Sequence, residues 1–290
     1  MSVYRKLVNI YTPALQQGFL GAGHMASPVI QGDFRESDPF IALMDDRLTK
    51  QTDQPAGGPH PHAGFETVSL LLEGEMGDDA HRMEGGDLQL MTAGSGIIHT
   101  ETIEGKLSMR LLQLWLNLPK KNRWVSPRVQ DLPLAKVPTL TQDGAEIKVY
   151  SGSLAGLTSP IQNYTPLLIA DIRLQPGATT VQHIPASYTA FVYVLEGSIQ
   201  VGDEAGEVHQ DQVGWLNRDS TEPVSELRLA GGKTGGRLVL YAGEPQGDPI
   251  VSYGPFIGDT QDDIRRLYQE YRQGKMNHIA TVPASQRILW

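Results

Sequence analysis

Two short segments of the chain carry side chains that could bind a metal ion. The first segment contains His60 and His62, and the second contains His99 and Glu101. Because successive side chains of an extended strand alternate between faces, residues two apart share a face, and each segment would offer two ligands in one direction. If the two strands lie side by side, the four donor groups converge. Three of the eight histidines of the chain belong to this arrangement.

The lack of cysteine limits the chemistry of such a site. The chain can form no disulfide and offers no thiolate, so a bound metal must use imidazole and oxygen donors. Iron, manganese, nickel, copper and zinc all suit that donor set. In octahedral geometry three imidazoles and one carboxylate leave positions for exchange, where an enol or a phenol would have a lowered pKa and dioxygen could meet the resulting anion. Iron(II) can also transfer an electron, whereas zinc cannot.

Glu66 is a further candidate because it belongs to a strand predicted for residues 65–73. Counting back along that strand in steps of two places Glu66, His62 and His60 on one face, provided that the chain at residues 63–64 keeps the alternation. On that face Glu66 could orient a ligand imidazole or act as a general base. Alternatively, it bonds only to the backbone.

Histidine pairs also occur without a metal. Two histidines on one strand can be surface residues or hydrogen-bonded core residues. The second pair, His99 and Glu101, favours the metal site because strands and turns separate it from the first pair and could return it to the same place. His24, in contrast, lies in a glycine-rich loop without an evident partner, and we expect it to be a solvated surface residue.

The residues around both pairs have the pattern of short β-strands separated by turns. Apolar side chains alternate along the strands, and glycine-rich segments mark the turns. The longest run is apolar on both faces, so we expect it to be covered on both sides. This pattern predicts a small antiparallel barrel or jelly roll. The expected strands of this half are residues 65–73, 88–92, 97–101 and 107–118.

A second copy of the pattern follows later in the chain. Residues 177–197 repeat the order of residues 58–74, which implies two copies of one supersecondary unit. The second copy has Pro185 where the first has His62, and no His-x-Glu pair follows it. One imidazole cannot hold a divalent ion against water, so we predict a single metal site and interpret His183 as a leftover or a core histidine.

The chain is expected to consist of two domains. Residues 1–120 would form an N-terminal metal-binding domain and residues 145–290 a metal-free C-terminal domain. Residues 121–144 are interpreted as a linker, because prolines interrupt any regular element there. A closing helix is predicted at about residues 260–273, since Asp259 or Thr260 can cap its start.

Composition narrows the classes of function. A chain of 290 residues can bury a large core without help from a metal. Its net charge of −9 argues against direct binding to nucleic acid. We find no signal peptide and no apolar run of membrane-spanning length, so we expect a cytoplasmic protein that does not bind membranes.

Several long motifs resemble those of the pirin family of the cupin superfamily. They are Pro59–Val68, Gly86–Gly94 with Gly96–His99, and Tyr253–Phe256. The resemblance implies an all-β fold of two face-to-face cupin domains, which are jelly-roll β-barrels, with a short C-terminal helix. It also implies a mononuclear iron, Fe(2+), in the N-terminal barrel. The ligands implied by position are His60, His62, His99 and Glu101, and the second barrel is expected to be metal-free.

The resemblance implies a function as well. Members of this family are similar in having quercetin 2,3-dioxygenase activity, which opens the ring of a flavonol with O2 and releases carbon monoxide. In this chain Glu101 or Glu66 would take the proton of the substrate hydroxyl. Gln113, Met91 and Trp115 are candidates to line the pocket, with Gln113 the first to consider.

Two other functions are compatible with the sequence. The protein could be a redox-sensitive regulatory protein that binds a transcription factor or a metabolic enzyme, as other pirins do. Lys120, Lys121 and Arg123 form the compact basic cluster that could serve such a partner. Alternatively, since cupins with similar ligands use zinc, the protein could be a metal-dependent isomerase or hydrolase.

Overall fold

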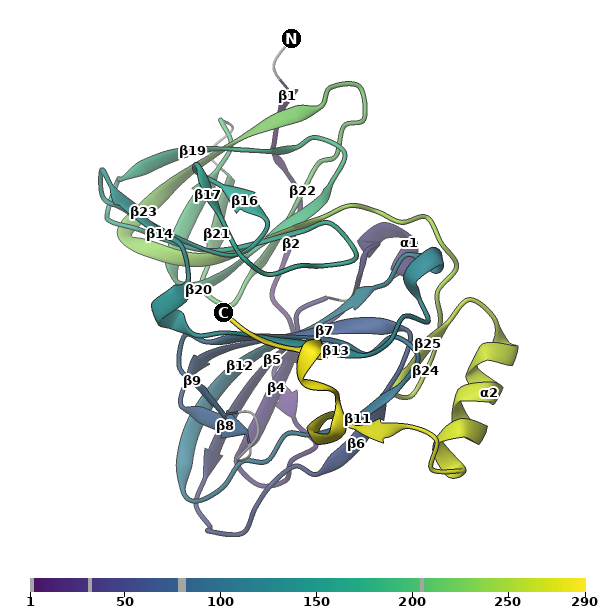
Figure 1. The fold of residues 1–290 in the computed structure, drawn as a ribbon. Helices are drawn as coiled ribbons and strands as arrows, with labels where there is room; N and C mark the ends of the chain where they lie inside the picture. The colour runs from purple at the N-terminus through teal and green to yellow at the C-terminus, as the bar shows by residue number, and fades with distance from the viewer. Residues whose placement is uncertain (1–2, 31–32, 78–81, 204–205) are drawn as a thin grey trace. The chain divides into compact units, whose positions relative to one another are not determined.

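The computed structural model describes residues 3–30, 33–77, 82–203 and 206–290 (Figure 1). The chain forms two compact units, and each is assembled from two separate stretches of sequence. We call residues 14–136 with 246–290 the histidine unit, and residues 1–13 with 137–245 the second unit. Both units consist mainly of β-strands, so the prediction of an all-β fold is confirmed.

The histidine unit contains two main sheets. An eight-stranded sheet has the order β27-β13-β10-β7-β12-β5-β4-β3, and a three-stranded sheet has the order β26-β11-β6. Because neighbours in the sheets are often distant in sequence, the strands follow the crossing order of a jelly roll. The strands are β3 (Gln16–Gln17), β4 (His24–Pro28), β5 (Phe40–Lys50), β6 (Pro59–His62), β7 (Phe65–Glu73), β8 (Glu75–Gly77), β9 (Arg82–Glu84), β10 (Leu88–Thr92), β11 (Ile97–Thr100), β12 (Leu107–Asn117), β13 (Arg128–Leu132), β24 (Val251–Tyr253), β25 (Phe256–Gly258), β26 (Asn277–His278) and β27 (Arg287–Leu289).

Strand β12 shows why this sheet is stable. It lies between β5 and β7 and pairs antiparallel with both. Met109 and Leu111 are buried on one face, and Leu112 and Leu114 on the other. The expectation that this strand is covered on both sides is therefore confirmed, and burial of apolar side chains on both faces stabilises it.

The segment interpreted as a linker contains two strands. β13 pairs with β10 in the histidine unit, and β14 (Thr139–Gln142) pairs with β15 (Ala145–Ser151) in the second unit. The prediction that prolines prevent regular structure there is wrong, because Pro127, Pro133 and Pro138 lie just outside the strands. Proline is tolerated at strand ends, where no ladder hydrogen bond is lost.

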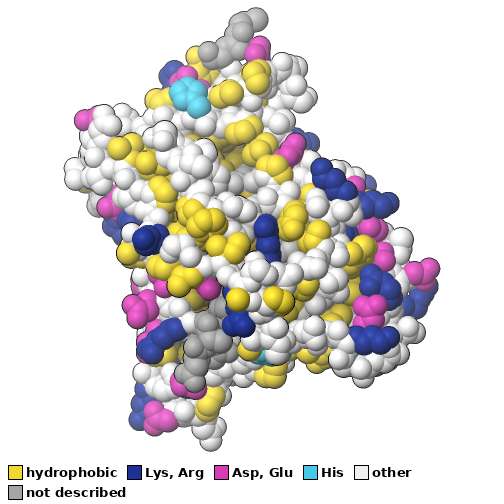
Figure 2. Space-filling view, in the orientation of Figure 1, with side chains coloured by type: hydrophobic (Ala, Val, Ile, Leu, Met, Phe, Trp, Pro, Cys, Tyr) yellow, Lys and Arg dark blue, Asp and Glu magenta, His cyan; other side chains and the backbone are white. Residues whose placement is uncertain are grey.

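The C-terminal residues belong to the histidine unit. Helix α2 (Gln261–Arg272) begins at the N-cap Thr260, whose side chain forms a reciprocal capping box with Asp263. It buries Ile264 and Leu267 against a cluster that includes Ala63 at the end of β6. Its exposed side carries alternating acidic and basic side chains, on the right in Figure 2.

The remaining short helices and the second unit complete the fold. The histidine unit also contains α1 (Phe34–Ser37), η1 (Lys120–Asn122), η2 (Leu134–Lys136), η3 (Ile279–Thr281) and η4 (Ala284–Gln286). Among the described residues, no helix is long and apolar enough to span a membrane. In the second unit a ten-stranded sheet surrounds an aliphatic core. Its strands, besides β14 and β15, are β1 (Val3–Tyr4), β2 (Leu7–Tyr11), β16 (Ser153–Leu154), β17 (Leu157–Thr158), β18 (Leu167–Leu174), β19 (Thr179–Pro185), β20 (Thr189–Val201), β21 (Gly206–His209), β22 (Val213–Leu216) and β23 (Val224–Gly243), of which β16 and β17 form a separate hairpin.

Candidate metal centre

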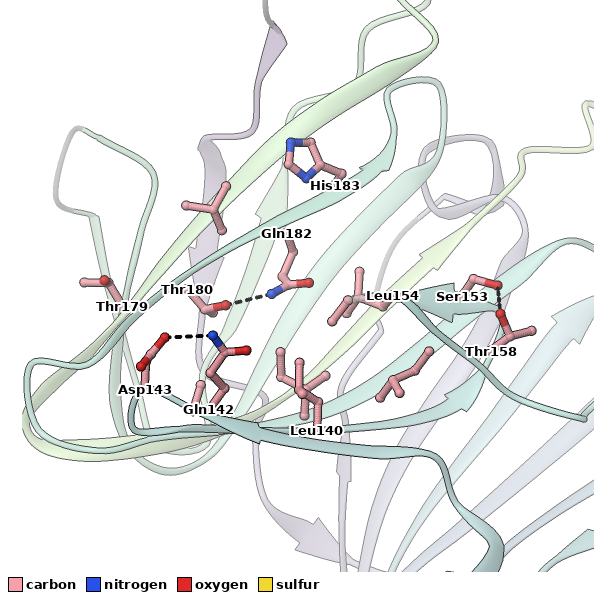
Figure 3. Close-up of a pocket in the computed structure, with 16 residues that line it drawn as sticks. Leu140, Gln142, Asp143, Ser153, Leu154, Thr158, Thr179, Thr180, Gln182 and His183 are labelled. Carbon is pink, nitrogen blue, oxygen red and sulfur yellow. Dashed lines mark hydrogen bonds between the residues drawn. The ribbon is translucent and has the colours of Figure 1, made fainter.

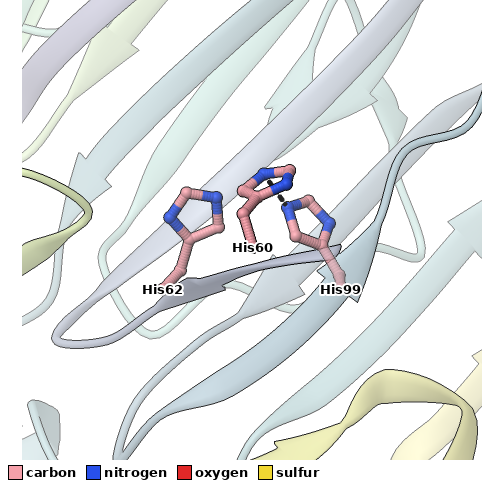
Figure 4. A group of neighbouring side chains, drawn as sticks. All are labelled: His60, His62 and His99. Carbon is pink, nitrogen blue, oxygen red and sulfur yellow. Dashed lines mark hydrogen bonds between the residues drawn. The ribbon is translucent and has the colours of Figure 1, made fainter. Parts of the chain in front are cut away.

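Strands β6 and β11 bring three histidines together. The two strands pair antiparallel, with His99 opposite His60 and Ile97 opposite His62. One ring nitrogen from each of His60, His62 and His99 lies within 4.8 Å of the others (Figure 4). The structure thus brings together three of the four side chains that the sequence predicted as ligands.

The ring contacts of His60 define the centre of the cluster. Its Nδ1 donates to the Gly58 carbonyl at 2.8 Å, which leaves the lone pair on Nε2. That Nε2 lies 2.8 Å from Nε2 of His99. Two ring nitrogens therefore face one another at the point where a shared ligand would bind.

The two ring nitrogens of His62 face different ways. Nε2 is directed toward the other two rings, and the buried Nδ1 faces away from them (Figure 4). The ring also contacts the Pro255 carbonyl through a hydrogen bond. Pro255 lies in the turn between β24 and β25. The Tyr253–Phe256 motif therefore contacts the ring of a predicted metal ligand.

Burial keeps two of the imidazoles neutral. It lowers the pKa of His62 to about 3, and the charge of His60 lowers it further, while the hydrogen bond to Pro255 acts in the opposite direction. Burial also lowers the pKa of His99, with smaller contributions from the neighbouring histidines. Neutral imidazoles have a free lone pair, which is the form that binds metal ions.

Glu101 lies beside the cluster but outside it. Its Oε2 is 3.9 Å from Nε2 of His60. Burial, and then the charge of Asp46, raise the pKa of its carboxyl to about 7. Because Glu101 directly follows the end of β11, it is the nearest predicted oxygen donor to the three rings.

Glu66 does not join the cluster. It is fully buried, lies opposite Thr92 on β10, and accepts a hydrogen bond of 2.7 Å from the Thr92 hydroxyl. Its neighbours Phe65 and Thr67 occupy the face of β7 that carries the ring of Trp115 on β12. By alternation Glu66 points to the opposite face.

Gly64 explains the change of face. It lies between β6 and β7 with a φ of +87°, a conformation that favours glycine. A Cβ there would lie 1.9 Å from the Ile257 carbonyl oxygen, so the backbones approach closely. The alternation that the sequence carried from β7 back to His62 is interrupted at this residue.

Two aromatic rings lie next to His62. The rings of Trp115 and Phe65 lie 5.3 Å and 5.2 Å from the His62 ring, centroid to centroid. Gln113, on the same strand as Trp115, accepts a 2.7 Å hydrogen bond from Ser69. Met91 is fully buried in a separate apolar cluster. Of the three candidates for the pocket, Trp115 is the one that contacts a predicted ligand.

The expectation that His24 is solvated is wrong. His24 is buried; its Nδ1 accepts from the Leu20 N–H at 3.1 Å, and its Nε2 donates to Asp46 at 2.9 Å. The loop of glycines turns back over the ring, and Gly18 permits the contact because a Cβ there would lie 2.2 Å from Nδ1. Sequence reasoning missed this pair because the partner lies on another strand.

The second unit has a cavity of about 670 Å³, and its described residues include no comparable ligand set (Figure 3). Gln182 of β19 is buried and donates to the Thr180 hydroxyl at 2.7 Å. His183 is exposed at the rim, on the other side of the strand from Gln182. Of the two interpretations of His183, a core histidine is therefore wrong. The described residues contain one cluster of potential metal ligands, and it lies in the histidine unit.

The donor set of the histidine unit fits a divalent metal ion. With metal–nitrogen distances of about 2.1 Å, neighbouring ligands of one ion are about 3–3.5 Å apart. The ring nitrogens are already within 4.8 Å of one another, and burial holds two of the rings neutral. These properties define a possible metal site, whatever the identity of the ion.

The fold and the site define a two-domain cupin protein with a histidine cluster in one domain. Residues 23–116 match the model of the family described as Pirin, and residues 169–277 match the Pirin C-terminal cupin domain. Pirin of Homo sapiens is 35% identical over 254 residues, which cover 84% of this chain and 84% of that protein. The chain belongs to the pirin family.

Two solved structures are similar over most of the chain. GK1651 from Geobacillus kaustophilus is 33% identical with a TM-score of 0.75, and the match covers 86% of this chain and 100% of that one. A quercetin 2,3-dioxygenase from Acinetobacter baumannii is 25% identical with a TM-score of 0.83, covering 96% of this chain and 100% of that one. The two family-model matches confirm the prediction of two cupin domains.

Proposed function

We propose that this protein is a metal-dependent dioxygenase of the quercetin 2,3-dioxygenase type, with Fe(II) as its metal. The observation that carries the proposal is the convergence of three imidazoles, two of them buried and neutral, next to the Glu101 carboxyl. The similarity to a structure titled quercetin 2,3-dioxygenase supports the choice of reaction. A flavonol and O2 would be the substrates.

In this proposal the side chains divide the tasks. His60, His62, His99 and Glu101 would hold the metal. When bound, Fe(II) would supply a Lewis acid for a substrate hydroxyl and a redox couple for reaction with dioxygen. Glu101 is the carboxyl nearest to the rings and would take the proton of that hydroxyl.

The surroundings of the rings favour an aromatic substrate. The rings of Trp115 and Phe65 lie beside His62, tilted by 36° and 4.5 Å apart, centroid to centroid. Phe65 is fully buried behind the half-buried Trp115, so the pair excludes water on one side of His62 and leaves the Trp115 ring to contact an aromatic substrate. A buried neutral site also strengthens the interaction between a metal and an anionic substrate oxygen, because the local dielectric is low.

Aerobic turnover of quercetin tests the proposal. The iron-loaded protein should bleach the flavonol absorbance and consume oxygen. His99→Ala should abolish both signals, whereas His183→Ala, at the exposed corresponding histidine of the second unit, should retain them. Iron-loaded protein that turns over neither quercetin nor other enediols would contradict the proposal.

Elemental analysis of protein purified without added metal tests the identity of the ion. The proposal expects about one iron for each chain. Zinc in its place would favour an isomerase or a hydrolase, because zinc supplies no redox couple. Manganese, nickel or copper would contradict the choice of iron but not the proposed dioxygenase reaction, because these metals also supply a redox couple.

The hypothesis of a regulatory protein rested on a basic cluster of three residues, and one of them is not at the surface. Arg123 is fully buried and donates to Asp259 at 2.8 Å and to the Gly64 carbonyl at 2.9 Å. It supports the turn behind β6 and cannot serve a partner protein. The basic cluster is thereby reduced to Lys120 and Lys121, and most such pairs are simply solvated.

A cytoplasmic location is part of the same proposal. It is motivated by the described residues, among which no helix is long and apolar enough to span a membrane. Cell fractionation followed by immunodetection would test it. Recovery in a membrane or exported fraction would contradict it.

A further inference from the structure

The C-terminal residues lie directly against the strand that carries His99. β26 pairs parallel with β11, with Asn277 opposite Ile97 and His278 opposite Ile98. The strand order β26-β11-β6 therefore places the ligand strand β11 in the middle, between β6 and the yellow C-terminal segment of Figure 1. A part of the chain almost 180 residues away borders the metal centre, since the Thr100–His278 contact spans 178 positions.

The end of β11 needs additional support. Thr100 is the last residue of the strand, and Glu101 follows it without regular structure. The residue opposite Thr100 on β6 is Pro59, which has no backbone N–H to donate. Contacts from the other side of β11 must therefore contribute to holding this end in place.

His278 supplies such a contact. Its Nδ1 accepts a hydrogen bond of 3.1 Å from the Ala280 N–H and so caps the short helix η3. In the neutral ring the proton is then on Nε2, which lies 2.8 Å from the Thr100 hydroxyl and donates to it. The ring is fixed at both nitrogens, so it links the C-terminal segment to the last residue of β11.

Apolar packing holds the segment around His278. Ile279 and Val282 are buried in one cluster with Ile97 of β11. Met276 packs on Gly96, where a Cβ would lie 3.0 Å from its terminal carbon. The segment is thus anchored before and after His278, and the hydrogen bond to Thr100 starts from a fixed position.

We propose that His278 is a positioning residue of the metal centre. Through the Thr100 hydroxyl it fixes the end of β11, and Thr100 stands between the two predicted ligands His99 and Glu101. With Thr100 held on one face of the strand, its two neighbours are directed to the other face by alternation. This role rests on the proposed metal site, and its test measures metal binding rather than turnover.

Two substitutions separate the contacts of His278. His278→Gln can still place an amide N–H near the Nε2 position, whereas His278→Asn keeps an acceptor near Nδ1 for the cap but is too short to reach Thr100. Thr100→Val removes the acceptor while preserving the shape of the side chain. We expect His278→Asn and Thr100→Val each to weaken Fe(II) or Ni(II) binding about tenfold, the low end of the losses seen when support outside the ligands is removed, because the strand end that carries His99 and Glu101 is no longer held. His278→Gln should bind metal nearly as well as the wild-type protein.

The double variant and a neighbouring control complete the test. His278→Asn combined with Thr100→Val should bind no more weakly than either single variant, because both remove the same hydrogen bond. Thr281→Val removes a 2.7 Å hydrogen bond within the same segment, to the His278 carbonyl, and should leave metal affinity unchanged. Affinities would be measured by chelator competition, alongside the melting temperature of each metal-free protein.

The outcomes distinguish the proposals. Wild-type affinity in His278→Asn and Thr100→Val would overturn the role of His278, and so would a loss in His278→Gln as large as in His278→Asn. A lower melting temperature with unchanged metal affinity would make His278 merely structural and would also overturn it. Wild-type protein that binds iron but oxidises neither quercetin nor other enediols would contradict the proposed function and leave this test intact.

Discussion

Strands β6 and β19 occupy corresponding places in the two copies of the repeat, yet they present their histidines differently. On β6, His60 and His62 both point to the cluster with His99. On β19, Gln182 is buried beside the cavity, and His183 is exposed. A shift of one residue moves every side chain of a strand to the other face. The comparison shows that a metal site needs the correct face as well as the correct residue type.

The partner strand differs too. β6 pairs with β11, which contributes His99, whereas β19 pairs with β23, which contains no histidine. A lone imidazole on β19 would have no second ligand even if it pointed inward. The second unit therefore retains the strand order of the repeat while its cavity is lined mainly by neutral side chains.

The largest expected effect is loss of the metal. His99→Ala removes the one imidazole that β11 contributes to the cluster. It should weaken divalent metal binding by about 100-fold or more, because a ligand is lost outright. His183→Ala should have no effect. Metal content after gel filtration in dilute chelator would measure both. Equal metal loss in the two variants would contradict the claim that only the histidine unit binds a metal.

The glycine that changes the face of the strand should be sensitive. Gly64→Ala forces a Cβ against the Ile257 carbonyl at a φ of +87°, and we expect it to destabilise the protein by about 3 kcal/mol. Gly177→Ala, just before β19, also has a positive φ of +70° but meets nothing within 4 Å, so it should cost about 1 kcal/mol. Urea unfolding would compare them. Equal costs would show that close backbone approach is unimportant at Gly64.

The pH dependence of the metal-free protein should come partly from His62. Its pKa is lowered to about 3 by burial, so the folded state binds fewer protons than the unfolded state. Its contribution to stability is present above the ordinary histidine pKa and is lost as the pH falls toward 3. Between pH 7 and pH 5 this amounts to about 2 kcal/mol.

His62→Gln should remove that part of the slope. Urea unfolding of the metal-free wild-type and variant proteins at pH 7, 6 and 5 would measure it. His183→Gln is the matched control, because an exposed histidine in the second unit should leave the slope unchanged. Identical slopes for all three proteins would contradict the burial of a neutral His62.

A smaller effect is expected at His24. His24→Leu leaves Asp46 without its 2.9 Å donor and should destabilise the protein by about 1 kcal/mol. The exposed His183→Leu should change stability by a few tenths of a kcal/mol at most. Thermal unfolding of both variants would check this, and an equal change in the two would mean that the His24–Asp46 pair contributes nothing.

The sequence predicted those features that depend on local patterns. The spacing of His60 and His62, the position of His99, and the capped helix, predicted at about residues 260–273 and observed at Gln261–Arg272, are all properties of short segments. Alternation and capping act over a few residues, so they can be recognised without the fold.

Long-range features could not be predicted in this way. Nothing local to His278 indicates that it lies beside β11, and nothing local to His24 identifies Asp46 as its partner. The face of Glu66 depended on the backbone conformation of one glycine, Gly64, which the alternation rule did not include. These contacts arise from strand pairing between distant segments, and the pairing is a property of the whole sheet.

The most direct test of the account is X-ray absorption spectroscopy of the iron-loaded protein. The account predicts three imidazole nitrogens with oxygen donors in the remaining places, and loss of one imidazole from the signal in any of His60→Ala, His62→Ala or His99→Ala. An iron environment without imidazole scattering, or one that is unchanged in all three variants, would contradict it.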